Sequence, residues 1–124
     1  MSTALDRSFT VGAPRTTNGT FTDLDCFASN CDGRPLMHSL VLSGSGAVDG
    51  VLTLYRGTEV DLGGTKTIVF DQTAAATVTV SGGTNQAGNS TSFEVAGCEH
   101  WRGVLSGLSA STTARWVVSY GLRS

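Results

Sequence analysis

The feature of this sequence that most restricts its fold is an alternation of apolar and polar residues at every second position. In residues 76–80, for example, Val78 and Val80 alternate with Thr77 and Thr79. Side chains along a β-strand point alternately to its two faces, so this pattern is typical of a strand with one buried face. Similar segments follow one another from about Leu36 to the end of the chain, and none has the period of a helix. The pattern predicts an all-β protein.

These segments number about eight, which suits a single β-sandwich with jelly-roll-like connections, with a closed barrel as the alternative. Residues 36–42 are apolar at both alternating sets of positions, so we expect a central strand covered on two sides. Trp116, Val118 and Tyr120 share one face, which we expect to be buried. The other predicted strands are residues 51–56, 66–70, 92–95 and 101–108. Gly63-Gly64 predicts a tight hairpin turn, and residues 43–46 and 81–90 predict loops.

The first 35 residues differ in composition from the rest of the chain. They contain both prolines, several polar runs and few apolar residues. We therefore divide the chain into an extended N-terminal arm, residues 1–35, and a β-sandwich domain, residues 36–124. An arm of this kind can add a strand to the sheet of a neighbouring protein. The alternative interpretation is that these residues form the ordinary first hairpin of the sandwich.

Charge and length exclude several classes of partner. The chain has 124 residues, enough for one domain, and a net charge of −2. Seven of its eight basic residues are arginines, and they are scattered, so we expect no nucleic-acid binding, which needs clustered cations. No segment has the length of a signal peptide or a membrane span, so we expect synthesis in the cytoplasm of a host cell and no membrane association. The low charged fraction, 15%, suits a surface that packs against other proteins.

The sequence offers weak candidates for metal binding and catalysis. Cys26, Cys31, Cys98 and His100 are residue types that zinc accepts, but their spacing is unlike that of zinc ribbons and fingers. We therefore expect no metal and no cofactor, and leave open whether Cys26 and Cys31 are free, disulfide-bonded or metal-bound. His38 lies among apolar residues and is expected in the core. No nucleophile motif precedes a predicted helix, so we expect no enzymatic activity.

Taken together, the helix-poor, Gly/Ser/Thr-rich composition and the polar N-terminal arm resemble those of small bacteriophage virion proteins, above all capsid decoration (cement) proteins. The resemblance covers the whole chain as architecture and composition and includes no family motif. It implies a noncatalytic protein of the virion that binds the major capsid protein as a homo-oligomer, such as a trimer, and stabilises the capsid. Many weak contacts repeated on a lattice would give strong attachment.

Within this resemblance, large side chains of the arm are the expected capsid contacts, and a second pair is expected to join copies of the chain. The partner-binding residues predicted in this way are Phe9, Arg15, Phe21, Phe27, Trp101 and Arg102. Two alternatives share much of the same evidence. One is another virion role, in a tail, baseplate or fibre; the other is a carbohydrate-binding module, in which Trp101 and Tyr55 would be exposed for stacking on sugars.

Overall fold

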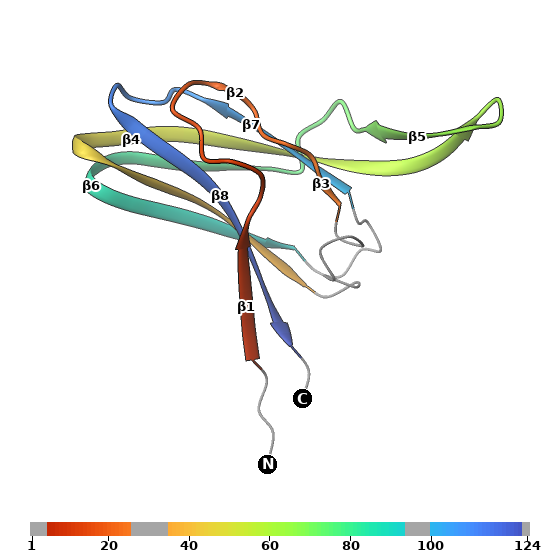
Figure 1. Ribbon diagram of the computed structural model, residues 1–124, viewed down its shortest axis with the longest axis horizontal. Coiled ribbons are helices and arrows are strands. Elements are labelled where there is room, and N and C mark those ends of the chain that lie inside the picture. The colour runs from red at the N-terminus through yellow and green to blue at the C-terminus, as the bar shows by residue number, and fades with distance from the viewer. Residues whose placement is uncertain (1–4, 26–34, 94–99, 123–124) are drawn as a thin grey trace, which may run out of the picture.

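The structure, a computed structural model, describes residues 5–25, 35–93 and 100–122, and within these the side chains of residues 8–25, 35–93 and 100–120 (Figure 1). The described residues contain eight β-strands and no helix. An all-β protein is therefore confirmed. The strands are β1 (Leu5–Thr10), β2 (Gly19–Thr20), β3 (Leu24–Asp25), β4 (Leu36–Leu62), β5 (Thr65–Phe70), β6 (Ala76–Phe93), β7 (His100–Ser106) and β8 (Thr112–Leu122).

All eight strands belong to one antiparallel sheet in which β4 is the central element. The first part of β4 lies between β6 and β8, with Leu40 opposite both Asn89 and Trp116. Its middle part lies between β6 and β7, with Leu52 opposite both Val78 and Leu105. Its last part, from Gly57 onward, pairs with β5. One strand of 27 residues therefore takes part in three regions of the sheet.

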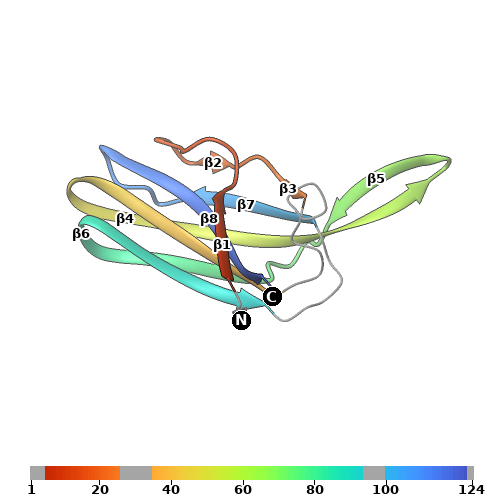
Figure 2. The same cartoon turned by 60° about the horizontal axis from the view of Figure 1, so that its bottom comes forward.

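The ribbon formed by β4 and β6 folds over on itself, so that the sheet makes two facing layers (Figure 2). The fold-over coincides with two irregularities in the β4–β6 register, between Ser43 and Ala47 and between Val48 and Gly50. Bulges of this kind bend a strand and increase its twist. The first layer contains β1, β8, the first part of β4 and the last part of β6. The second layer contains β2, β3, β7 and the remaining parts of β4 and β6.

The core lies between these two layers. Its fully buried side chains include Trp116 and Leu40 from the first layer and Trp101 and Leu52 from the second. A close approach at Gly103 shows how tightly the layers pack, because a Cβ atom there would lie 2.9 Å from Cε3 of Trp116. The predicted buried face of β8 is confirmed, since Trp116, Val118 and Tyr120 are all buried.

The described part of residues 1–35 packs on this core. β1 pairs with β8, and the Val11 amide donates to the Trp116 carbonyl at 2.8 Å. The Phe21 amide donates to the Gly103 carbonyl at 2.9 Å, and β2 and β3 both pair with β7. Val11, Phe21 and Leu24 are buried. These residues therefore complete both layers of this chain's own sheet.

Several local expectations differ from the structure. Residues 43–46 and 81–90 were expected as loops but continue β4 and β6. The expectation failed because small residues are needed where the ribbon folds: a Cβ atom at Gly83 would lie 2.5 Å from that of Ala87. The Gly63-Gly64 turn is confirmed, with φ of +64° and +91°, as in a type I′ hairpin. The two separate sheets of a sandwich are not confirmed, because β4 and β6 run through both layers.

No helix long and apolar enough to cross a membrane occurs in the part of the chain that the structure describes.

Candidate protein-binding surfaces

The hairpin of residues 57–70, formed by the end of β4 and all of β5, consists mostly of exposed residues. It extends beyond the two layers, with its Gly63-Gly64 turn at the far end (Figures 1 and 2). Its register pairs Glu59 with Ile68 and Val60 with Thr67. Because directly opposite residues in an antiparallel pair point to the same side, this register assigns every hairpin side chain to one of two faces.

One of these faces carries no charge. We call it the uncharged hairpin face; it consists of Thr58, Val60, Leu62, Thr65, Thr67 and Val69. Leu62 is 58% exposed and Val69 45% exposed, the two highest values for large hydrophobic residues among those described. Five of the six are Thr or Val, which favour strands. This face therefore exposes apolar surface without a charged residue of its own.

The opposite face of the hairpin carries its charges and lies toward the body of the protein. Glu59 and Lys66 approach to 3.8 Å, and the Asp61 carboxylate accepts a hydrogen bond from the Gly64 amide at 2.7 Å. Ile68 and Phe70 on this face line an open hollow of about 370 Å³ together with residues of β3 and β7. The hairpin is therefore amphipathic, with its charged face toward its own protein.

An ion pair stands beside the base of the hairpin. Arg102 on β7 donates to both carboxylate oxygens of Asp23, at 3.0 and 3.1 Å, and its guanidinium lies 4.0 Å from the centre of the Phe70 ring. The hydrogen bonds to Asp23 raise the pKa of Arg102. These contacts tie β3, β5 and β7 together where the hairpin leaves the sheet.

A second surface with little charge is the outside of the first layer. We call it the first-layer outer face; its positions on β4, β6 and β8 are Met37, Ser39, Val41, Ser43, Gln86, Gly88, Ser90, Ser92, Thr113, Arg115, Val117 and Ser119, and the register continues it onto Asp6, Ser8 and Thr10 of β1. Met37 is 39% exposed and is the third exposed large hydrophobic residue among those described. Arg115 is the one charged residue of the part formed by β4, β6 and β8, and it donates to the Ser43 hydroxyl at 3.3 Å. An open hollow of about 540 Å³ lies beside it, lined by Val41, Gln86 and Ala87 among others.

Residues 36–42 were expected to be buried on both sides, but they are buried on one side only. Leu36, His38, Leu40 and Leu42 are buried between the layers. Met37, on the opposite side, is exposed, and Ser39 and Val41 are half-buried. The strand is central, as expected, but its outer side is a surface of this chain.

The expected core position of His38 is confirmed, and its surroundings are aromatic. Its ring is fully buried against Phe93, Trp101 and Trp116, with ring centres 4.8–5.7 Å away. The Trp116 Nε1–H donates to His38 Nδ1 at 3.0 Å, so the imidazole is neutral and carries its proton on Nε2. Burial lowers the pKa of His38 to about 4. Within the parts of the chain that the structure describes, Nε2 of His38 and Nε1 of Trp101 have no hydrogen-bond partner.

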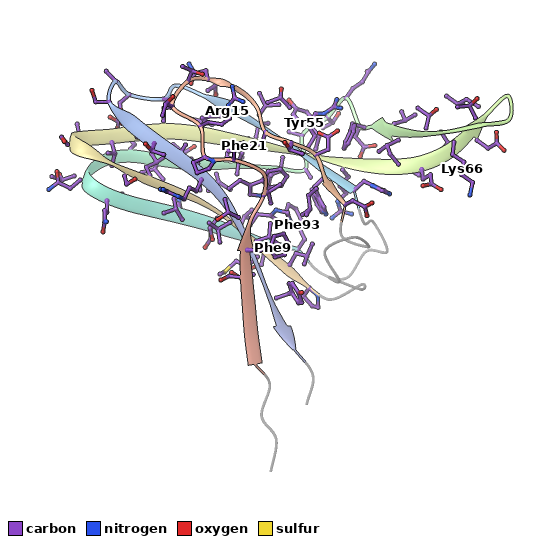
Figure 3. The ribbon with its side chains drawn as sticks, in the orientation of Figure 1. Phe9, Arg15, Phe21, Tyr55, Lys66 and Phe93 are labelled. Carbon is purple, nitrogen blue, oxygen red and sulfur yellow. The ribbon has the colours of Figure 1, made fainter. Side chains whose placement is uncertain are left out.

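The structure separates the predicted partner-binding residues into buried and accessible ones; Phe9, Arg15 and Phe21 are labelled in Figure 3. Phe21 and Trp101 are only 3% and 2% exposed. The expectation that Trp101 is a surface aromatic is therefore wrong: its strand alternates Trp101, Gly103 and Leu105 toward the core. Phe9 is half-buried and packs edge-on against Tyr120.

Arg15 and Arg102 already have partners within the chain. The Arg15 guanidinium donates to the carbonyls of Thr17, Asn18 and Thr20, each at 3.2 Å. It thereby holds the turn before Phe21, over whose ring it lies at 6.0 Å. Arg102 is bound to Asp23 and remains partly exposed. Phe27 lies outside the described residues.

Of the four zinc candidates, the described structure includes only His100. Cys26, Cys31 and Cys98 lie outside the described residues, and His100 at the start of β7 is half-buried. Within the described parts of the chain, no group of three or more His, Cys, Asp or Glu side chains is placed to hold a metal ion. Whether Cys26 and Cys31 form a disulfide is likewise outside what the structure describes.

Comparison with known proteins adds a distant likeness. No family model matches the sequence, and no curated protein matches it. Among solved structures, the chain is similar to the crystal structure of YomS, a protein derived from the SPBc2 prophage, with a TM-score of 0.48 and 18% sequence identity over 96% of each chain. Similarity at this level identifies neither a shared family nor a shared activity.

Proposed function

We propose that this chain is a noncatalytic structural protein of a bacteriophage virion that binds major capsid protein subunits and decorates the capsid. The observation that carries the proposal is the projecting hairpin with its uncharged face. A two-stranded ribbon is marginally stable in water, and exposed Leu62 and Val69 add unfavourable apolar surface. A ribbon of this kind gains stability when another protein covers it, which is the situation of a subunit in a large assembly.

The remaining surface supports the same proposal. On β4, β6 and β8, the first-layer outer face is built from Ser, Thr, Gly, Gln and Val, with Met37 as its exposed large hydrophobic residue and Arg115 as its one charged residue. Faces with few charged side chains are typical of the centres of protein interfaces, because no charge has to be desolvated on contact. The buried interior is filled by Trp101, Trp116 and the residues around them, and the hollows on the surface are open. Binding to protein surfaces, with no chemical step, is the activity that this arrangement favours.

The second candidate is a virion position outside the capsid shell, in a tail, baseplate or fibre. The projecting hairpin supports it equally, since such assemblies also bury ribbons between subunits. The number of copies of this chain per particle distinguishes the two candidates. The third alternative, a carbohydrate-binding module, required an exposed Trp101 to stack on sugars. The structure does not support it, because the Trp101 side chain is buried.

The proposal is tested by adding purified protein to capsids that lack it. The particles are made from the encoding strain after deletion of the gene, incubated with increasing amounts of protein and separated by gradient sedimentation. We expect saturable binding, with a number of copies comparable to that of the major capsid protein. Saturation at a few copies per particle would favour the tail or baseplate, and no co-sedimentation at any concentration would contradict a virion role.

A further inference from the structure

The long strand β6 is an edge of the sheet along its whole length. It pairs with β4 in both layers and with no other strand among those that the structure describes. Residues 76–80 form the edge of the second layer and residues 86–93 the edge of the first, and both halves lie on the same side of β4 (Figure 2). The backbone N–H and C=O groups on the far side of β6 are therefore directed away from the sheet.

Two hydrogen bonds of Asn89 identify the groups on this open side. Alternate residues of an antiparallel strand bond to the neighbouring strand, and the residues between them face the other way. The Ser90 amide donates to Asn89 Oδ1, and the Thr79 carbonyl accepts from Asn89 Nδ2, both at 2.9 Å, so these two groups face the open side and not β4. In the continuous register of the first-layer half, Gly88 and Ser92 share the orientation of Ser90. Their side chains are exposed and small, so the open side is accessible.

This edge lacks the features that usually keep an edge strand from pairing. Natural proteins shorten their edge strands or place charges or proline on them. The 18 residues of β6 include no charged residue and no proline. The other edge strands are protected: β1 contains Asp6 and Arg7, β5 contains Lys66, and β2 and β3 have two residues each. The longest edge among the described strands is thus the one open to another strand.

We infer that the first-layer edge of β6 binds an extended, uncharged segment of a capsid subunit, which adds a strand antiparallel to β6. The inference rests on the proposed function for the source of the segment, and it identifies a second binding surface and its mode of binding. Main-chain hydrogen bonds join the two strands, as in other cases of strand addition. The edge offers no charged partner, so a charged side chain on the segment would lose hydration without compensation.

The size of the edge favours an extended segment over a second folded copy of this chain. Residues 86–93 span about 27 Å and residues 76–80 about 17 Å, and a layer is about 10 Å thick. Two copies paired along both halves would therefore cover about 440 Å² each, well below the roughly 800 Å² per partner of a stable interface. A segment of a capsid subunit needs less area, because the hairpin binds the same particle and raises the effective concentration of the segment.

The capsid-binding experiment tests this inference with two charge variants. S90K/S92K places two lysines at exposed edge positions of β6, where charge opposes strand addition. We expect its affinity for capsids that lack the protein to fall by about tenfold or more, through the lost main-chain hydrogen bonds. The matched control S8K/T10K adds the same charge at exposed positions of β1, the opposite edge of the first layer, and should bind as the wild type does. Urea midpoints check that the three proteins are equally folded.

Hydrogen exchange of the unaltered protein tests strand addition directly. Free and capsid-bound protein are placed in deuterated water, and exchange is followed by mass spectrometry of proteolytic fragments. We expect slower exchange on the capsid in residues 86–93, where the amides of Gly88, Ser90 and Ser92 gain acceptors from the added strand. Residues 5–10, at the opposite edge of the layer, should exchange equally fast in both states.

Three results would overturn the inference and leave the proposed function intact. The first is binding of S90K/S92K equal to that of the wild type, or unchanged exchange in residues 86–93 on the capsid. The second is an equal loss of binding in both double variants, which would assign the effect to charge alone. The third is a dimer of the free protein in analytical ultracentrifugation that S90K/S92K dissociates, which would make a second copy the occupant. Wild-type protein that binds no capsid contradicts the proposed function, and the inference with it.

Discussion

Acidification should weaken this fold through His38, the buried imidazole between the two layers. In the folded protein its pKa is lowered to about 4, whereas an exposed histidine in the unfolded chain has a value of 6.5. Below pH 6.5 the unfolded state therefore binds a proton that the folded state does not. The contribution of His38 to the free energy of unfolding is complete above pH 6.5 and is lost as the pH falls toward 4.

The pKa difference, 6.5 − 4 = 2.5 units, corresponds to about 3 kcal/mol, at about 1.4 kcal/mol per unit. This contribution is a large part of the roughly 5–15 kcal/mol that stabilises a typical domain. Protonation at Nδ1 also removes the acceptor for Trp116 Nε1–H, so the charged form loses a hydrogen bond as well as its hydration. The two effects act in the same direction.

The measurement is urea unfolding at several pH values from 7 to 4, followed by tryptophan fluorescence, for the wild type and His38→Gln. Carboxylates titrate in both proteins, so the difference between the two pH profiles isolates His38. We expect the wild type to lose about 3 kcal/mol more than His38→Gln over this range. Thr77→Gln, a substitution at an exposed position of β6, is the control and should follow the wild type. Equal losses in the wild type and His38→Gln would refute the reasoning.

Two further substitutions test the packing between and beside the layers. Gly103→Ala should destabilise the protein by about 1–3 kcal/mol, because the added Cβ would lie within about 3 Å of Trp116 and Leu52; an unchanged urea midpoint would contradict the close approach. Arg102→Gln should cost only about 0.2–1 kcal/mol, since its ion pair with Asp23 is more than 40% exposed on each side chain. A loss of several kcal/mol in Arg102→Gln would mean that this pair is far more important to the base of the hairpin than its exposure indicates.

The sequence was a good guide wherever one face of a strand is buried and the other exposed. Val78, Val80, Trp116 and Tyr120 were placed correctly because their neighbours at alternate positions are polar or less buried. The Gly63-Gly64 turn was found because few residues other than glycine adopt two successive positive φ angles. These are local signals, and they do not depend on which strands become neighbours.

The incorrect sequence-based predictions concern positions whose environment depends on distant parts of the chain. Residues 81–90 have a loop-like composition because the folded ribbon needs small residues against Val48 and Ala87. Trp101 has polar neighbours, His100 and Arg102, which suggested exposure, although the alternation with Gly103 and Leu105 indicated burial. Phe21 is buried because the opposite layer presents Trp116 to it, with ring centres 6.0 Å apart.

The projecting hairpin could be predicted only in part from the sequence. Its turn and its second strand, residues 66–70, were predicted, but the strand before the turn was predicted to end at Arg56, and the separation of charged from uncharged residues appears only in the register of residues 57–70. What the sequence did not reveal is that this ribbon extends past the second layer, because that depends on where β7 begins opposite Gly57. The hairpin surface could therefore be identified only once the arrangement of the strands was known. Of the residues predicted in the N-terminal arm, Phe21 is buried in the core and Arg15 is hydrogen-bonded within the chain.

The central claim, that this chain is a structural protein of a virion, is tested most directly by quantitative mass spectrometry of purified particles from the encoding strain. The quantity measured is the number of copies of this chain per copy of the major capsid protein. A ratio near one, within a factor of a few, is the predicted result for a capsid decoration protein. Absence of the chain from purified particles would contradict a role in the virion.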